Sequence, residues 1–238
     1  MLPTIQLGNK ENPPLVFLHG FMGSKEDFLE LAGYFSSDYH CILLDLPGHG
    51  ESNSFAPHSK PFIWAKDLIQ ETVKDLDDPT FIAYSLGGRL LLHLDAPKRV
   101  FISSHLGLKT LEEKRLRKGQ DASQISRLQD NFEGFLNNWY NQDLFVGLEK
   151  TSLIERRERN NPEHLAKAME AFSLSKQKLF EPQEGDFFLC GEKDKKYHSL
   201  YQKRACPFAV IPSASHAPHL ENPKLVFETI NTHLKERS

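Results

Sequence analysis

A serine in a short, glycine-containing turn is the first residue whose surroundings point to chemistry. Ser85 lies in the run AYSLG (83–87), between an apolar strand-like segment and a segment with helical spacing. Small residues on both sides permit a tight turn, which strains the serine backbone and pushes its hydroxyl out over a sheet. The start of the following helix favours negative charge there. The pattern predicts a nucleophile elbow, although a serine between small residues also occurs by chance in strand-helix turns.

An acid and a histidine follow this serine in an order that one class of Ser-His-acid enzymes uses. Asp194 follows the apolar run 186–190, and His216 follows the apolar run 208–211. Both residues therefore come directly after predicted strands. Chain order and placement together predict that Ser85, Asp194 and His216 form a catalytic triad.

Two rivals for the triad positions remain open on spacing alone. Glu192 lies two residues before Asp194, and His219 lies three residues after His216. The two histidines could also suggest a metal site, but no cysteine, histidine or carboxylate cluster of zinc type accompanies them. We therefore expect neither a metal nor another cofactor.

A second glycine turn follows the apolar run 15–18 and is suited to binding an oxyanion. The backbone N–H of Leu86, just after the nucleophile, and that of Phe21 in this turn are the expected donors. His19 and His49 lie in glycine turns of the same kind. Both are expected to be structural rather than catalytic.

The elements that must hold these residues alternate between strand and helix in both halves of the chain. Strands are predicted over 15–18, 41–44, 80–83, 100–102, 186–190 and 208–211, and helices over 24–34, 61–76, 86–94 and 223–235. Ser24 is expected to cap the first helix, with Asp27 completing a capping box.

One long segment breaks this alternation. Residues 107–181 are rich in Glu, Lys, Arg and Gln, carry apolar residues at helical spacing and have no strand-like run. We predict an α/β fold with a mostly parallel, doubly wound sheet formed by 1–106 and 182–238, and an inserted helical cap over 107–181.

Composition limits the class of protein. The chain has 238 residues, of which 39% are hydrophobic and 26% charged, with a formal net charge of −3, so it can bury a core and has no overall basic field for nucleic acid. The start of the chain has no signal-peptide pattern, and no apolar run approaches the length of a membrane span. We expect a cytoplasmic protein with no membrane or nucleic-acid partner. Cys41 and Cys190 lie in apolar runs and are expected to be buried thiols.

Five motifs resemble those of the α/β-hydrolase superfamily. They are HGFMGS (19–24), DLPGHGES (45–52), AYSLGGR (83–89), GEKDKKY (191–197) and SHAPHLENP (215–223). Further motifs, YSLGGR (84–89), Trp139-Tyr140 followed by Phe145, the stretch 165–177 and the stretch 191–197, resemble the 2-succinyl-6-hydroxy-2,4-cyclohexadiene-1-carboxylate synthase family of menaquinone biosynthesis.

This resemblance implies a lyase. Its members eliminate pyruvate from 2-succinyl-5-enolpyruvyl-6-hydroxy-3-cyclohexene-1-carboxylate, with the triad acting as a base and without a cofactor. The implied partner is thus a small polycarboxylate. The residues that match the family's substrate-binding positions are Arg89, Arg117, Arg157, Tyr84, Trp139 and Phe145.

The arginine assignments fit the chemistry, because a guanidinium binds a carboxylate through two parallel N–H bonds. Arg89 comes one helical turn after Ser85, which would direct it toward the site. The two cap arginines lie in charged runs that could be solvated helix faces with i,i+4 ion pairs. Arg115, Arg156 and Arg159 are therefore rivals for those two positions.

Three departures from the family pattern occur, with Ala83, Ser215 and Tyr197 standing where Gly, Gly and Phe are usual. None removes a chemical group that the reaction needs. Two alternatives remain open: a carboxylesterase or carbon-carbon hydrolase that uses the triad as a nucleophile, and a binding protein of the same fold that has lost catalysis. The sequence does not predict an oligomeric state.

Overall fold

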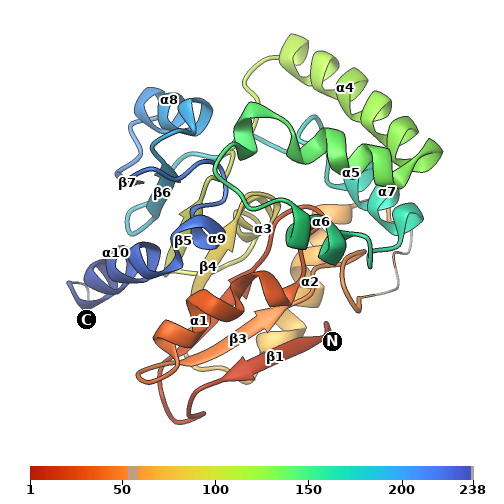
Figure 1. The fold of residues 1–238 in the computed structure, drawn as a ribbon. Coiled ribbons are helices and arrows are strands. Elements are labelled where there is room, and N and C mark those ends of the chain that lie inside the picture. The colour runs from red at the N-terminus through yellow and green to blue at the C-terminus, as the bar shows by residue number, and fades with distance from the viewer. Residues whose placement is uncertain (53–54, 56–57, 237–238) are drawn as a thin grey trace.

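The computed structural model describes residues 1–52, 55 and 58–236. Within them seven strands form one sheet, in the order β1-β3-β2-β4-β5-β6-β7 (Figure 1). The strands are β1 (Thr4–Leu7), β2 (Pro14–Leu18), β3 (His40–Leu44), β4 (Thr80–Tyr84), β5 (Arg99–Ile102), β6 (Phe187–Gly191) and β7 (Phe208–Ile211). Every neighbouring pair is parallel except β1 with β3. The predicted α/β fold with a mostly parallel sheet is confirmed, with β1 as an additional strand.

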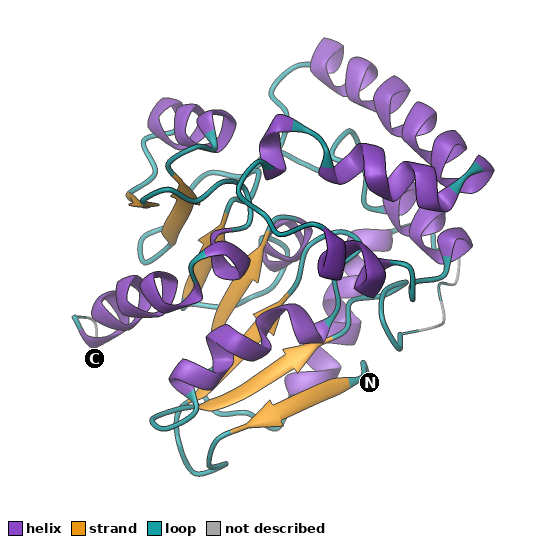
Figure 2. Cartoon of the chain, viewed as in Figure 1, coloured by secondary structure: helices purple, strands orange, loops and turns teal. Residues whose placement is uncertain are grey.

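Helices cover both faces of the sheet (Figure 2). α1 (Leu29–Phe35) and α10 (Pro223–Lys235) pack on one face, and α2 (Pro61–Val73), α3 (Leu86–Leu91) and α8 (Lys195–Lys203) on the other. Strand β2 shows how the sequence arranges this, because its successive side chains alternate between the two cores: Leu15 and Phe17 belong to one, and Val16 and Leu18 to the other. A strand that is buried on both faces has a continuous apolar run in its sequence, which is why the sequence predicted this strand.

The first helix differs from the prediction. A 3₁₀ helix (Lys25–Phe28) precedes α1, and Ser24 makes no side-chain cap hydrogen bond, so the expected capping box is wrong. The carboxylate of Asp27 instead accepts hydrogen bonds from Arg157, 130 residues away. A charge-assisted pair of bonds outcompetes a single local backbone N–H for the same oxygens.

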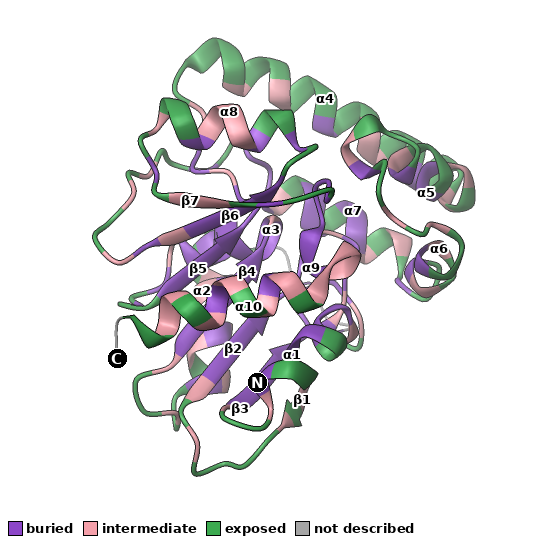
Figure 3. Cartoon of the chain, turned by 60° about the vertical axis from the view of Figure 1, so that its left-hand side comes forward, coloured by how far each residue is buried: buried purple, intermediate pink, exposed green. Residues whose placement is uncertain are grey.

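Residues 107–181 contain only helices among the structured elements that the structure describes. They are α4 (Leu111–Asp130), α5 (Phe132–Tyr140), the 3₁₀ turn η2 (Asp143–Phe145), α6 (Thr151–Arg157) and α7 (Pro162–Ala171). These helices lie across the carboxyl ends of the strands (Figure 1) and form an apolar cluster of their own. Most of α4 faces solvent (Figure 3). No helix in the described part of the chain combines the length and apolarity needed to cross a bilayer.

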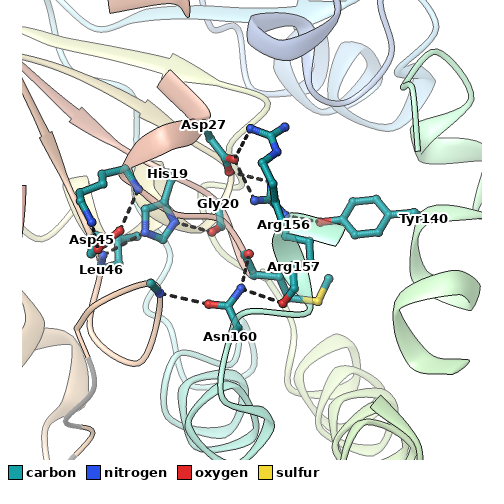
Figure 4. Close-up of polar contacts among 12 residues, drawn as sticks. His19, Gly20, Asp27, Asp45, Leu46, Tyr140, Arg156, Arg157 and Asn160 are labelled. Atoms are coloured by element: carbon teal, nitrogen blue, oxygen red, sulfur yellow. Dashed lines mark hydrogen bonds and ion pairs between the residues drawn. The ribbon is translucent and has the colours of Figure 1, made fainter. Parts of the chain in front are cut away.

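A buried ion pair joins this cap to the sheet domain (Figure 4). Arg157 on α6 donates from Nη1 and Nη2 to the two oxygens of Asp27 at 2.8 and 2.7 Å, and from Nε to the Tyr140 hydroxyl at 3.0 Å. Burial opposes both charges, yet Arg157 lowers the pKa of Asp27 and Asp27 raises the pKa of Arg157. Asn160 adds a neutral link, because its amide donates to the Met22 carbonyl at 3.0 Å.

Removal of one partner of this pair is expected to be strongly destabilising. Asp27→Ala leaves the Arg157 guanidinium buried without a counter-charge, so the free energy of unfolding should fall by about 3 to 5 kcal/mol in urea titrations. Asp27→Ala with Arg157→Met should regain part of that loss, because it removes the orphaned charge as well. The exposed Asp38→Ala is the control. A loss below about 1 kcal/mol in Asp27→Ala would contradict the assignment.

Several histidines are buried in a neutral form. Burial lowers the pKa of His49, His105 and His219 to about 3. The His219 ring lies against Phe28 and Tyr84, at centroid distances of 4.7 and 4.3 Å, and neither of its nitrogens has a hydrogen-bond partner among the described residues. Such a ring is stable in the fold only while it carries no proton.

The fold should therefore lose stability on mild acidification. These histidines have a pKa near 6.5 when unfolded, so below about pH 6.5 the unfolded state binds more protons than the folded state. Their contribution is complete above that pH and is lost as the pH falls toward about 3. His219→Phe should reduce the loss of unfolding free energy between pH 7 and 5 by about 2 kcal/mol. His164→Gln, at a partly exposed site on α7, should leave the loss unchanged, and an equal loss in His219→Phe and the wild type would refute the argument.

Candidate active site

Ser85 occupies a strained turn between β4 and α3. Its φ of 48° and ψ of −104° lie outside the regions that non-glycine residues usually adopt. The turn is possible because α3 approaches the sheet very closely: a Cβ on Gly87 would lie 2.3 Å from the Leu18 carbonyl oxygen, and one on Gly88 would lie 2.4 Å from Ser104 Oγ. These glycines fix the serine at the carboxyl edge of the sheet.

The structure brings Asp194 and His216 together at the same edge. His216 Nδ1 lies 2.7 Å from Asp194 Oδ2, and the other Asp194 oxygen accepts a hydrogen bond from the backbone N–H of Tyr197 at 3.2 Å. Because Nδ1 donates to the carboxylate, neutral His216 presents the lone pair of Nε2. Ser85 and His216 line one cavity. Ser85 Oγ makes no hydrogen bond to a described residue, as is common for catalytic pairs before substrate binds.

The rival triad residues lie elsewhere. Glu192 is exposed and accepts a hydrogen bond from the backbone N–H of Ser213 at 2.9 Å. His219, on the short helix α9 (Pro218–Glu221), is buried beneath Tyr84 and does not line the cavity. Of these two acids and two histidines, Asp194 and His216 are the pair that the described structure joins by a hydrogen bond.

The turn after β2 contains Phe21, the second residue whose backbone N–H is expected to bind an oxyanion. Phe21 and Leu86 both line the cavity, and their backbone N–H groups have no hydrogen-bond partner in the described part of the chain. His19 holds the turn, because its Nδ1 lies 2.7 Å from the Gly20 carbonyl oxygen and its Nε2 accepts from the backbone N–H of Leu46 at 3.0 Å (Figure 4). Both ring nitrogens are thus used within the turn, which fits the structural role expected of His19.

The cavity lies between the cap and the sheet and encloses about 420 Å³. Besides Ser85 and His216, its lining includes every substrate-binding residue expected from the sequence, namely Arg89, Arg117, Arg157, Tyr84, Trp139 and Phe145. Among the described lining residues, four are cationic, and Asp27 and Asp121 are the only carboxylates. A chain with an overall negative charge therefore surrounds this cavity with excess positive charge.

Arg89 is a buried cation without a carboxylate partner. Its Nε donates to Gln177 Oε1 at 2.7 Å and its Nη2 to the Phe172 carbonyl, so both acceptors are neutral. Burial, and then the nearby charge of Arg117, lowers the pKa of Arg89 to about 9, which still leaves it protonated at pH 7. An anion bound here would relieve an unfavourable charge.

The two cap arginines differ from Arg89 because each already has an acidic partner. Arg117 Nε donates to Asp121 Oδ1 at 2.6 Å, and Arg157 is paired with Asp27. Arg157 has two N–H groups left beyond those used by Asp27 and Tyr140. Their register rivals, Arg115, Arg156 and Arg159, do not line the cavity.

Aromatic rings surround the His216 imidazole. Tyr84, Phe145 and Tyr197 lie against it at centroid distances of 5.3, 5.6 and 4.9 Å. The backbone N–H of His216 also donates to the Leu144 carbonyl of η2 at 3.1 Å. The cap thus helps to hold the loop that carries His216 as well as covering it.

Several lining residues escape sequence reasoning, among them His105, Gln120, Gln124, Tyr140 and Lys196. Gln120 and Gln124 are spaced one turn apart on a mostly polar helix, which is also typical of a solvated face. The position of Lys196 near the cavity could have been predicted from the sequence, because Lys196 lies two residues after Asp194, in the first turn of α8.

Comparisons with known proteins agree with this geometry. The family model described as "Alpha/beta hydrolase family" matches residues 15–229. The 2-succinyl-6-hydroxy-2,4-cyclohexadiene-1-carboxylate synthase of Klebsiella pneumoniae subsp. pneumoniae is 32% identical over 236 residues, covering 92% of each chain. The structure of MenH from S. aureus superposes with a TM-score of 0.90 and 25% identity over 99% of both chains.

An esterase from Thermogutta terrifontis shares the fold, with a TM-score of 0.76 at 19% identity over 99% of this chain and 93% of its own. The fold alone therefore fits both a lyase and an esterase. Identity above 30% across almost the whole chain is what decides between the families. The chain belongs to the 2-succinyl-6-hydroxy-2,4-cyclohexadiene-1-carboxylate synthase family, within the α/β hydrolases.

Proposed function

We propose that this protein is a lyase that eliminates pyruvate from 2-succinyl-5-enolpyruvyl-6-hydroxy-3-cyclohexene-1-carboxylate to give 2-succinyl-6-hydroxy-2,4-cyclohexadiene-1-carboxylate. The observation that carries the proposal is the unneutralised buried charge of Arg89 in a cavity shared with Ser85 and His216. A substrate with three carboxylates uses such a charge, whereas a neutral ester does not. Relatives at 32% identity bear the name of this synthase.

The triad acts as a base in the proposed mechanism. His216, oriented by Asp194, accepts the Ser85 proton, and Ser85 Oγ removes the ring proton beside the succinyl ketone. The electron pair of the broken C–H bond moves into the ring system, and negative charge collects on the succinyl carbonyl oxygen. The backbone N–H groups of Phe21 and Leu86 stabilise that oxyanion.

The leaving group departs as the charge returns from the oxyanion. The C–O bond to the enolpyruvyl group breaks, its electron pair leaves with the oxygen, and protonation on carbon gives pyruvate. The ring proton has by then restored the Ser85 hydroxyl, so the proton held by His216 passes, directly or through solvent, to the pyruvate enolate and returns the imidazole to its neutral form. No acyl-enzyme forms, so the serine is needed for its basicity and not as a nucleophile.

Positive charge on the cavity wall favours this pathway over hydrolysis of neutral esters. Arg89, Arg117 and Arg157 are proposed to bind the substrate's carboxylates, with Arg157 using the N–H groups that Asp27 leaves free. Tyr84, Trp139 and Phe145 are proposed to pack against the ring. Binding of all three carboxylates orients the ring proton toward Ser85.

Loss of the serine hydroxyl should abolish elimination. Ser85→Ala removes the base that contacts the ring proton, so kcat for pyruvate release should fall by at least about a thousandfold while KM changes little. Pyruvate is followed in a coupled lactate dehydrogenase assay. Ser126→Ala, on the exposed face of α4, is the matched control. Retention of wild-type pyruvate release in Ser85→Ala would rule out the mechanism, and fast hydrolysis of p-nitrophenyl acetate with no pyruvate release by the wild type would favour an esterase instead.

Loss of the Arg89 charge should lower the activity with little effect on the stability of the fold. Arg89→Met should lower kcat/KM for pyruvate release by about a hundredfold, because one charge-assisted contact with the substrate is lost. The free energy of unfolding should change by less than about 1 kcal/mol, because the substitution also removes an unneutralised buried charge. Arg115→Met on α4 serves as the control for removal of a positive charge. Equal kcat/KM values in Arg89→Met and Arg115→Met would exclude a role for Arg89 in binding.

A further inference from the structure

Three cationic side chains gather on the wall of the cavity next to the catalytic Asp194. Arg89 comes from α3, Arg117 from α4 and Lys196 from the first turn of α8, and all three line the cavity. Desolvation by the surrounding wall is the largest cause of a lowered pKa of Lys196, and the charges of Arg117 and Arg89 lower that pKa further. Segments that are far apart in the sequence thus converge on one small region.

The negative charge available to them is small. Asp121 is the one carboxylate of the described lining on this side, and its oxygens are used by Arg117 and by the Ser173 hydroxyl at 2.6 and 2.5 Å. Asp194 is held by His216 at 2.7 Å. Lys196 has no ion pair or hydrogen bond with a described residue, and its ammonium lies 5.5 Å from the centre of the Tyr197 ring. Arg89 and Lys196 therefore form no ion pair with any described carboxylate.

His105 adds a neutral donor to the same wall. Its Nδ1 accepts a hydrogen bond from the backbone N–H of Gly107 at 3.0 Å, so the ring proton resides on Nε2. Burial, and then the charges of Lys196 and Arg89, lowers the pKa of His105 to about 3, which keeps the ring neutral at pH 7. The wall thus adds one neutral N–H donor to its three cationic side chains.

We propose that Lys196 is a substrate-binding residue that, together with Arg89 and Arg117, forms a subsite for two carboxylates and thereby selects polycarboxylates over monocarboxylates. Its side chain is accessible to solvent and lies in the cavity wall, so a ligand can reach it without any rearrangement of the core. The identity of the physiological ligand rests on the proposed function, whereas the preference for polycarboxylates rests on the charges alone. Lys196 is the second residue of α8, the helix whose N-cap is Asp194, which places the bound carboxylate beside the triad.

Calorimetric titration with propane-1,2,3-tricarboxylate tests this inference without catalysis. Lys196→Ala should weaken binding of the tricarboxylate by about tenfold, because a charge-assisted contact is lost. Lys196→Arg should keep binding within about threefold of the wild type, since the charge is retained. Lys195→Ala is the matched control, because Lys195 is the adjacent residue on the same helix turn, is exposed and does not line the cavity. It should bind like the wild type.

The same variants are then assayed for pyruvate release, where Lys196→Ala should raise KM more than it lowers kcat. Tricarboxylate binding by Lys196→Ala equal to that of the wild type, or an equal loss in Lys195→Ala, would overturn the proposal. So would a wild type that binds propane-1,2,3-tricarboxylate no more tightly than propionate. If the wild type releases no pyruvate but the effect of Lys196→Ala on binding persists, the proposed function fails and the subsite stands.

Discussion

The pair between Asp27 and Arg157 is the contact on which the geometry of the cavity depends. It joins a 3₁₀ turn of the sheet domain to the end of α6 in the cap, through two parallel hydrogen bonds of 2.8 and 2.7 Å in a buried setting. Buried ion pairs add little net stability relative to apolar residues, but the loss of either partner is costly. The main effect of such a contact is therefore to fix how the cap docks on the sheet domain. Its contribution to the overall stability of the fold is smaller. In this docking Trp139, Phe145 and Arg117, all from the cap, line the cavity.

The sheet domain contributes a different constraint, which is steric. The backbone of Ser85 is strained, and it is held there because the glycines that follow let α3 pack directly against β2 and Ser104. The carboxyl ends of β4, β6 and β7 lie at one edge of the sheet, so a strained serine, a carboxylate and a histidine distant in sequence become neighbours. The sheet domain carries Ser85, Asp194 and His216, while the cap carries Arg117, Arg157, Trp139 and Phe145 of the cavity lining. This division fits a fold that serves esterases and lyases alike.

The cavity wall differs in charge from the chain as a whole. The chain is acidic overall, yet its cavity wall holds an excess of positive charge, with Arg89 bonded only to neutral acceptors. Burial of a cation without a counter-ion is unfavourable, and natural proteins keep such groups where a ligand supplies the missing charge. The arginines of the site accordingly differ in whether a carboxylate neutralises them. Arg157 is neutralised and orders the cap, whereas Arg89 remains available to an anion.

The sequence by itself determined the strands that are buried on both faces, the strand-end positions of Ser85, Asp194 and His216, and the helical character of 107–181. These features are local, because each depends on periodicity, turn composition or order along the chain. The edge strand β1 was missed because four residues with mixed burial carry too little periodic signal. Only the tertiary structure decided that Asp27 pairs with Arg157 instead of capping its own helix, that Arg117 and not Arg115 faces the cavity, and that Lys196 joins the cationic wall. Each of these depends on which surfaces meet across 50 or more residues, and a charged side chain takes its role from the partner it meets there.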